Sequence, residues 1–324
     1  MTGLDLAAIR AAQEMVRPHI WPTPLLPSQE LSRRASSPIF LKLECWQRTG
    51  SFKVRGALAR LARLSPQERA RGLVTASAGN HGLGLALAAR ALGMPPVLVF
   101  LPESAAQNKV RRLAESGCDL RRTGADYDTA HLEAERHAAE RGALFISAYD
   151  DPAVMAGQGT VGAEILDELP DADVLLVPVG GGGLVAGVAV AARALRPGIR
   201  IAGVQPEASP AAYLSLRDGR PHETYPAGPT ICDGLAGGFG RMPFEIAAGL
   251  IDEVLVVPEQ AVRHAVGWLV THEQLLVEGS GAIAIAPLLA GQVAAQGRKV
   301  VAILTGRNID SAVLRRCLEE FVDT

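Results

Sequence analysis

The chain has 324 residues, and an apolar fraction of 48% with 20% charged residues is typical of a globular protein with a large buried core. This length exceeds that of most single cores, so we expect two domains or one large α/β unit. The formal net charge of −2 provides no excess of basic residues for a polyanion, so we expect no nucleic-acid partner.

The N-terminal segment, residues 1–15, is predicted to be an ordinary helix. It contains Asp5 and Glu14 and lacks both a basic leader and an uninterrupted apolar stretch, so it does not resemble a signal peptide. The most apolar windows are broken by glycines and are too short to cross a bilayer, so no membrane span is expected. The four cysteines form no C-x-x-C pair, which argues against a zinc ribbon or a disulfide framework and fits a reducing cytoplasm.

Short apolar runs alternate along the chain with longer segments of helical period. The intervening segments, such as 82–92, 161–169 and 184–195, are mostly rich in Ala, Leu or Val. This alternation is typical of βαβ units, in which parallel strands are covered by helices on both faces. It predicts an α/β fold with strands at 39–43, 73–76, 97–101, 144–147, 174–179, 199–204, 254–257 and 300–304.

The first catalytic candidate is Lys53, which follows the strand at 39–43 in the sequence TGSFK and begins a helical run. A side chain at such a corner can reach the crevice at the carboxyl edge of a sheet. Only four of the 32 basic residues are lysines. An amine that must attack a carbonyl cannot be replaced by guanidinium, which stays protonated. The alternative is a solvated lysine in a first helical turn, but this scarcity favours a Schiff-base role.

A second candidate is the sequence SAGNHG at 77–82, between a predicted strand and a predicted helix. An anion site can form here from the hydroxyl of Ser77, the amide of Asn80 and free backbone N–H groups. Such a site is small enough to bind a substrate carboxylate. The competing interpretation is N-capping for Ser77 and Asn80 and a packing role for His81. For His81 taken alone we favour packing.

Four consecutive glycines, Gly180, Gly181, Gly182 and Gly183, separate the strand at 174–179 from a helical segment. Their backbone N–H groups can converge on an anion at the positive end of the helix dipole, so we predict a phosphate site. The alternative is a plain tight turn. The loop lacks the Gly-Lys-Ser/Thr of a Walker A motif and is not G-x-G-x-x-G, which argues against a nucleotide.

The last predicted strand ends in TGRN at 305–308. This position places the hydroxyl of Thr305 at the carboxyl edge of the sheet, where a cofactor ring would lie.

Taken in this order, these segments resemble the fold type II pyridoxal phosphate enzymes, and within them the serine/threonine dehydratase and serine racemase group. The resemblance covers nearly the whole chain and rests on LKLE at 41–44, GSFKVRGA at 50–57, SAGNHG, AGQGT at 156–160, the four glycines and TGRN. It implies a tryptophan synthase β-like fold with two open, twisted, mostly parallel sheets. The implied domains are a large cofactor-binding domain of residues 1–70 and 151–324 and a small domain of residues 71–150.

The resemblance also implies roles for individual residues, with Lys53 as the catalytic residue that holds pyridoxal 5′-phosphate as a Schiff base. The substrate loop comprises Ser77, Ala78, Gly79, Asn80 and His81, with Ser77 and Gly79 at the substrate carboxylate. The other cofactor contacts are Phe52 beside the ring, Asn80 at its 3′ oxygen, Gly180 to Gly183 at the phosphate, Thr305 facing the pyridine nitrogen, and Glu278 nearby.

The implied activity is β-elimination of water from a small hydroxy amino acid, such as L-threonine or L-serine, to give a 2-keto acid and ammonia. Alternatives are a related substrate (3-hydroxyaspartate, phenylserine or a product of hydroxyectoine breakdown), an amino acid racemase and a β-replacement synthase. A non-enzymatic phosphate-binding protein is disfavoured by the intact Lys53. The neutral hydroxyl of Thr305 is a poor partner for a pyridinium, which favours elimination. A homodimer is implied, and the end of the chain after Asp323 leads us to expect no regulatory domain and a catabolic role.

Departures from the family sequence bear on these expectations. Ala78 stands where racemases resembling this chain have a serine, which argues against racemisation. Gln205 and Ala211 stand where the carboxylates of a divalent cation site are expected, so we predict no metal. Arg307 could meet a second substrate carboxylate or point to solvent, and together with Leu83 it leaves the substrate side chain open.

Overall fold

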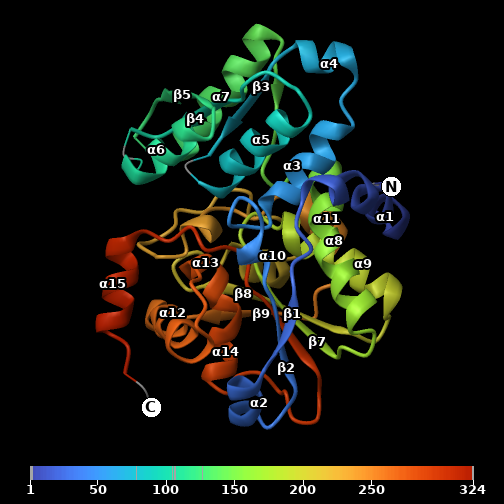
Figure 1. Cartoon of the computed structure of the whole chain (residues 1–324), viewed down its shortest axis with the longest axis vertical. Helices are drawn as coiled ribbons and strands as arrows, with labels where there is room; N and C mark the ends of the chain where they lie inside the picture. The colour runs from blue at the N-terminus through green and yellow to red at the C-terminus, as the bar shows by residue number, and fades with distance from the viewer. Residues whose placement is uncertain (1–2, 78, 104, 106, 126, 323–324) are drawn as a thin grey trace.

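The computed structural model describes residues 3–77, 79–103, 105, 107–125 and 127–322, and it contains two sheets that lie one above the other along the long axis of the molecule (Figure 1). The larger sheet has the order β1-β2-β10-β7-β8-β9 and the smaller has β5-β4-β3-β6. All neighbours are parallel except β1 and β2. The predicted α/β class with mostly parallel sheets is confirmed. The strands are β1 Leu25–Ser28, β2 Ile39–Lys42, β3 Leu73–Ala76, β4 Leu98–Leu101, β5 Asp119–Arg122, β6 Leu144–Phe145, β7 Val174–Pro178, β8 Arg200–Pro206, β9 Glu253–Val257 and β10 Val300–Ile303.

Helices connect and cover these strands. The α-helices are α1 Leu6–Val16, α2 Gln29–Ala35, α3 Lys53–Ala62, α4 Pro66–Ala70, α5 Asn80–Ala91, α6 Gln107–Glu115, α7 Tyr127–Arg141, α8 Pro152–Glu168, α9 Gly183–Leu195, α10 Ala211–Asp218, α11 Arg241–Ala247, α12 Glu259–Glu273, α13 Gly279–Ala282, α14 Ala286–Leu289 and α15 Ser311–Glu319. Short 3-10 helices lie at Arg17–His19, Glu44–Trp46, Asp233–Leu235 and Ile283–Ile285.

Each predicted apolar run overlaps a strand, and the two strands that were not predicted lie at sheet edges. The strand β1 carries Pro27, which an edge strand tolerates because one side of its backbone is unpaired. The strand β5 has the sequence DLRR with no buried residue, so it shows none of the apolar signal of a central strand.

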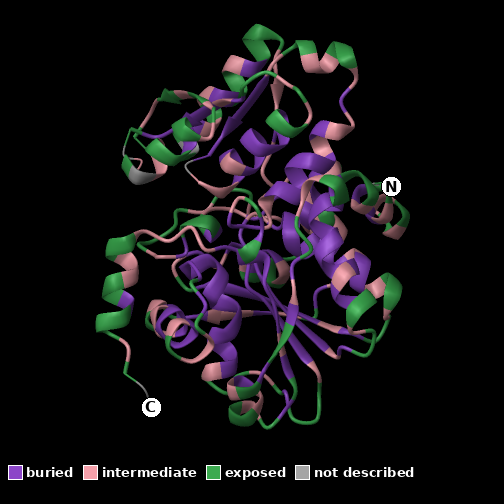
Figure 2. Cartoon of the chain, viewed as in Figure 1, coloured by how far each residue is buried: buried purple, intermediate pink, exposed green. Residues whose placement is uncertain are grey.

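The central strands and the helices beside them form the core, as the purple elements in Figure 2 show. Every residue of β7 and of β10 is buried, which explains their uninterrupted apolar sequences. The helices α8 and α9 pack closely because Gly187 of α9 lies against the backbone of Met155 and Gly159, where a Cβ atom would collide. This contact fixes the helix whose first turn follows the four glycines.

The strands of the smaller sheet come from residues 73–145, and those of the larger sheet come from both sides of that stretch. This arrangement supports our proposal of a large domain of residues 1–70 and 151–324 and a small domain of residues 71–150.

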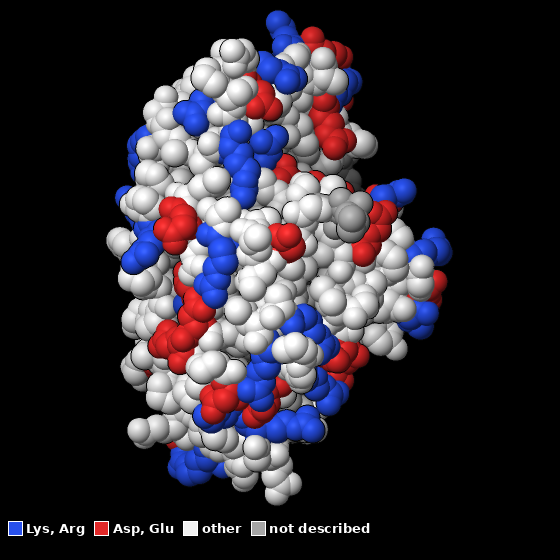
Figure 3. Space-filling view, turned by 90° about the vertical axis from the view of Figure 1, so that its right-hand side faces the viewer, with Lys and Arg blue, Asp and Glu red and all other residues white. Residues whose placement is uncertain are grey.

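Basic and acidic side chains are interspersed on the face shown in Figure 3. Of the helices in the described part of the chain, none is long and apolar enough to span a membrane.

A buried charge network fixes the helix that carries Lys53. The guanidinium of Arg55 on α3 is fully buried and contacts both carboxylate oxygens of the equally buried Glu44, at 2.7 and 2.8 Å. Arg55 also binds Glu164 of α8 at 2.7 Å, and Lys42 at the end of β2 reaches the same carboxylate at 2.8 Å. The network therefore joins β2, α3 and α8 directly beneath Lys53.

Replacement of Arg55 by Met is expected to lower the free energy of unfolding by about 3–5 kcal/mol, because it leaves the carboxylate of Glu44 buried without a counter-charge. Urea unfolding followed by circular dichroism measures the change. Arg111→Met is the control, since that arginine pairs with Glu115 on the surface and both side chains are about two-thirds exposed. Equal urea midpoints for the two variants would contradict the role assigned to the network.

Candidate active site

A cavity of about 590 Å³ lies at the carboxyl ends of the parallel strands. Its walls include Ser77, the four glycines and Thr305, which follow β3, β7 and β10, and Lys53, which begins the first α-helix after β2. Open α/β sheets bind ligands at this edge because the strand-to-helix loops converge there. The cavity therefore brings together the segments that the sequence singled out.

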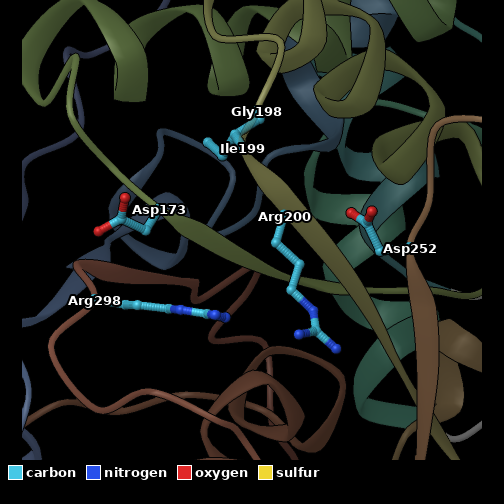
Figure 4. Close-up of a pocket in the computed structure, with 6 residues that line it drawn as sticks. All are labelled: Asp173, Gly198, Ile199, Arg200, Asp252 and Arg298. Atoms are coloured by element: carbon cyan, nitrogen blue, oxygen red, sulfur yellow. The ribbon is translucent and has the colours of Figure 1, made fainter.

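A second hollow, of about 550 Å³, lies at the opposite edge of the larger sheet (Figure 4). Asp173 and Asp252 directly precede β7 and β9, and their carboxylates are bound by Arg196 and Arg193 at 2.6 and 2.8 Å. The remaining lining residues are Gly198, Ile199, Arg200 and Arg298. Since its acids are already paired and it offers no nucleophile, we place the active site in the first cavity.

Lys53 is the first residue of α3, and its side chain lies against the cavity wall. Its Nζ atom donates a hydrogen bond to the backbone oxygen of Ala148 at 3.1 Å and lies 5.2 Å from the centre of the Phe52 ring. Burial lowers the pKa of Lys53 to about 8, since desolvation disfavours the ammonium form. Roughly one fifth of this amine is therefore neutral near pH 7.4, far more than for an ordinary lysine, and the neutral form is the one that a nucleophile requires.

The 77–82 loop joins the end of β3 to α5. The Oγ atom of Ser77 accepts hydrogen bonds from the N–H groups of Gly79 and Gly82, at 3.2 and 3.0 Å. The bond from Gly82 lies in the first turn of α5, so Ser77 acts as the competing interpretation proposed, whereas Asn80 is itself the first residue of that helix. The hydroxyl of Ser77 keeps its own hydrogen for an acceptor such as a carboxylate. Ala78 lies outside the described residues.

His81 lines the cavity but is buried, and its Nε2 atom lies 3.2 Å from the backbone oxygen of Ile146. Burial lowers its pKa to about 3, with the charge of Lys53 contributing, so the ring is neutral. Neutrality and burial support the packing interpretation of His81 over substrate binding.

The four glycines provide free donors. The N–H groups of Gly180, Gly181 and Gly182 have no acceptor among the described residues, although Gly180 and Gly182 are buried. Buried N–H groups without a partner are rare and costly, so an anion at this helix terminus would satisfy them. The residues present therefore fit a phosphate.

The structure adds a packing reason for these glycines. A Cβ atom on Gly181 would enter the ring of Tyr149, and one on Gly183 would lie 2.8 Å from the Cα atom of that residue. Gly182 adopts a φ of +97°, which side chains rarely tolerate. The absence of side chains at these positions therefore leaves space for Tyr149 and also exposes the backbone N–H groups.

Glu278 and Thr305 also line the cavity. Glu278 is buried, and its Oε1 atom accepts a hydrogen bond of 2.6 Å from the amide nitrogen of Asn80. Burial raises the pKa of this carboxyl, while the bond from Asn80 opposes that shift. The hydroxyl of Thr305 donates to the backbone oxygen of Ser280 at 3.2 Å. This bond is long enough to be exchanged for a ligand atom in the cavity.

Several lining residues were not assigned roles from the sequence. Lys109 and Arg112 enter the cavity from α6, and Asn308 enters it from the loop after β10. Lys109 forms an ion pair with Asp233 of the larger sheet's loops. The scarcity of lysine marked Lys109 for attention, but no sequence signal placed it near residue 233. Arg307, in contrast, is not among the described residues that line the cavity.

Gln205 occupies the position where the family sequence predicts a metal-binding carboxylate. Its amide is fully buried and is bonded to the oxygen of Val179 and to the N–H groups of Ala212 and Tyr213, at 2.9–3.2 Å. These bonds tie the strand before the four glycines to α10, which begins at Ala211. A neutral amide in a hydrogen-bonding role supports our expectation of no metal, which stays a prediction.

Comparison with known proteins identifies a family. The family described as "Pyridoxal-phosphate dependent enzyme" matches residues 16–306. An L-threonine ammonia-lyase of Geobacter sulfurreducens is 42% identical over 95% of this chain and 76% of its own length. The solved structure of maize serine racemase is 32% identical with a TM-score of 0.91, covering 98% of this chain and 97% of that one. The processed threonine deaminase isoform 2 of Solanum lycopersicum is also 32% identical, with a TM-score of 0.90, covering 97% and 86%.

The reactivity of Lys53 provides a test of the site that needs no cofactor. In the cofactor-free protein, acylation of Lys53 by acetic anhydride should rise with pH through a midpoint near 8, because burial lowers its pKa to about 8 from an ordinary 10.5. Peptide mass spectrometry resolves the four lysines after labelling at a series of pH values. A midpoint for Lys53 at or above 10 would contradict the desolvated environment described here.

Proposed function

The chain belongs to the pyridoxal-phosphate dependent enzyme family, and we propose that its reaction is the elimination of water from a small β-hydroxy amino acid to give a 2-keto acid and ammonia. The observation that carries the proposal is the meeting, in one cavity, of a desolvated lysine with buried N–H groups that lack an acceptor. Lyase names among the relatives support the same reaction class. L-Threonine and L-serine are the substrates we propose first.

The residues that would hold the cofactor surround the cavity. Lys53 would bind it covalently, the glycines at 180–183 would bind its phosphate, and Asn80 would donate to its ring oxygen. Phe52, Glu278 and Thr305 would contact the ring. When bound, pyridoxal phosphate supplies an electron-accepting ring conjugated to the α-carbon of the substrate.

The protein's own groups would then position the substrate and move its proton. The hydroxyl of Ser77, whose oxygen already accepts two backbone hydrogen bonds, would donate its hydrogen to the substrate carboxylate, with the N–H of Gly79 nearby. The neutral amine of Lys53 would accept the α-proton at Nζ. Thr305 offers a neutral hydroxyl, which does not hold a positive charge on a ring nitrogen as a carboxylate would, and this favours prompt loss of the β-hydroxyl.

We also propose that the enzyme works as a homodimer in the cytoplasm. The resemblance to the dehydratase group supports the dimer. The compartment is supported by Cys45, Cys118, Cys232 and Cys317, which are all free thiols, as a reducing environment maintains them.

Keto acid and ammonia release, measured with purified protein supplied with pyridoxal phosphate, tests the reaction. The panel comprises L-threonine, L-serine, 3-hydroxyaspartate and phenylserine, together with a β-replacement assay. At least one hydroxy amino acid should release both products in equal amounts, and Lys53→Ala should lower that rate by about 10²- to 10⁴-fold or more. Failure of every hydroxy amino acid, or full activity of the variant, would contradict the proposal.

Racemisation is the second candidate function, favoured by the close structural likeness to maize serine racemase. The residue that argues against it is Ala78, since an alanine cannot act as an acid on the face opposite to Lys53.

Replacement of Ala78 by Ser should therefore raise the rate of racemisation relative to elimination several-fold, because a hydroxyl can return a proton to the second face. Chiral chromatography of the remaining L-serine, run beside keto acid release, gives both rates in one sample. An unchanged ratio in the variant would show that residue 78 does not set the choice of reaction.

A further inference from the structure

Four polar side chains form a continuous hydrogen-bonded chain from the surface into the cavity. Nη2 of Arg112 donates to Oδ1 of Asn308 at 2.6 Å, and Nδ2 of Asn308 donates to Oδ1 of Asn80 at 2.6 Å. Nδ2 of Asn80 in turn donates to Oε1 of Glu278 at 2.6 Å. Each bond points in the same direction, from Arg112 towards the buried Glu278.

Arg112, a donor at the outer end of this chain, and the carboxylate of Glu278, an acceptor at its inner end, favour the same direction. A guanidinium can only donate, so the amide of Asn308 must turn its oxygen towards Arg112. Its nitrogen then faces inwards, where it also donates to the backbone oxygen of Thr49 at 2.9 Å, and a carbonyl can only accept. Asn80 must consequently turn its oxygen towards Asn308 and its nitrogen towards the cavity.

The middle of the chain is held by packing. Asn308 lies against Gly50, where a Cβ atom would collide with the Asn308 amide, and Gly50 has a φ of +77°. Arg112 itself is exposed on α6, which belongs with the smaller sheet, whereas Asn308 follows β10 of the larger one. The outer bond therefore also spans the two sheets at the cavity.

We propose that Arg112 is a positioning residue that, through Asn308, holds the Asn80 amide with its N–H groups towards the cofactor. The proposal rests on the proposed function in one respect, the assignment of Asn80 to the oxygen on the cofactor ring. An inverted Asn80 would present its carbonyl oxygen to that oxygen, and two acceptors repel. Although Arg112 also lines the cavity, in this role it acts through the two amides.

A double-mutant cycle between Arg112 and Asn80 tests the proposal. Wild type, Arg112→Met, Asn80→Ala and the double variant are titrated with pyridoxal phosphate, and each gives a Kd and the pH dependence of its visible absorption band. Asn80→Ala should raise the Kd by about five- to tenfold, as loss of one hydrogen bond in a buried site does, and should move the pH midpoint of the band. Arg112→Met should produce at least half of both changes.

The cycle separates orientation of Asn80 from a general structural effect of Arg112. In the Asn80→Ala background, Arg112→Met should change the Kd less than twofold, because no amide remains to be oriented. Arg112→Lys should restore most of the wild-type behaviour, since an ammonium also only donates. Asn308→Asp should match Asn80→Ala, as a carboxylate cannot donate to Asn80. Arg111→Met is the matched control on the exposed side of α6 and should leave the Kd and the band unchanged.

Two results would overturn the inference. One would refute the inference alone, and the other would also refute the placement of Asn80 in the proposed function. Additive effects of Arg112→Met and Asn80→Ala on the Kd would refute the positioning role while leaving Asn80 at the cofactor. An Asn80→Ala variant with unchanged Kd and spectrum would refute both the placement of Asn80 in the proposed function and the inference built on it.

Discussion

The buried ionic contacts of Arg55 are the constraint on which the site depends. This guanidinium binds two carboxylates from different segments, Glu44 after β2 and Glu164 on α8, and Lys42 of β2 binds Glu164 in turn. A buried charge without its partner is strongly unfavourable, so these segments have only one acceptable arrangement. Lys53 lies two residues before Arg55, and α8 packs against α9, which begins at Gly183, so that arrangement helps to bring the amine and the four glycines to one cavity.

Electrostatics inside the cavity follow from the same burial. Desolvation lowers the pKa of Lys53 and of His81 and raises that of Glu278, so each group is driven towards its neutral form. The shift for Lys53 makes its neutral amine available to accept a proton. Among the charged side chains that line the cavity, Lys109 pairs with Asp233.

Much of this architecture could be predicted from the sequence, and the exceptions have physical causes. Central strands such as β7 can be predicted because both of their faces are buried and their sequences are uninterrupted apolar runs. The edge strand β5 carries polar residues, so its sequence shows no such run. Lys53, Ser77 and the glycines were predictable because strand ends in a parallel sheet share one edge. The bond between Arg112 and Asn308 joins residues 196 apart in the chain, and only the folded arrangement of two sheets brings them together.

The contact between Tyr149 and the glycines restricts which substitutions are tolerated during evolution. The ring of Tyr149 occupies the space that a side chain at position 181 would need, so neither position can change freely while the other stays the same. A methyl group at 181 becomes tolerable only after the aromatic ring has been lost, and loss of the ring alone opens a void beside the phosphate site. Positions 149 and 181, 32 residues apart, should therefore covary among related proteins that have this loop.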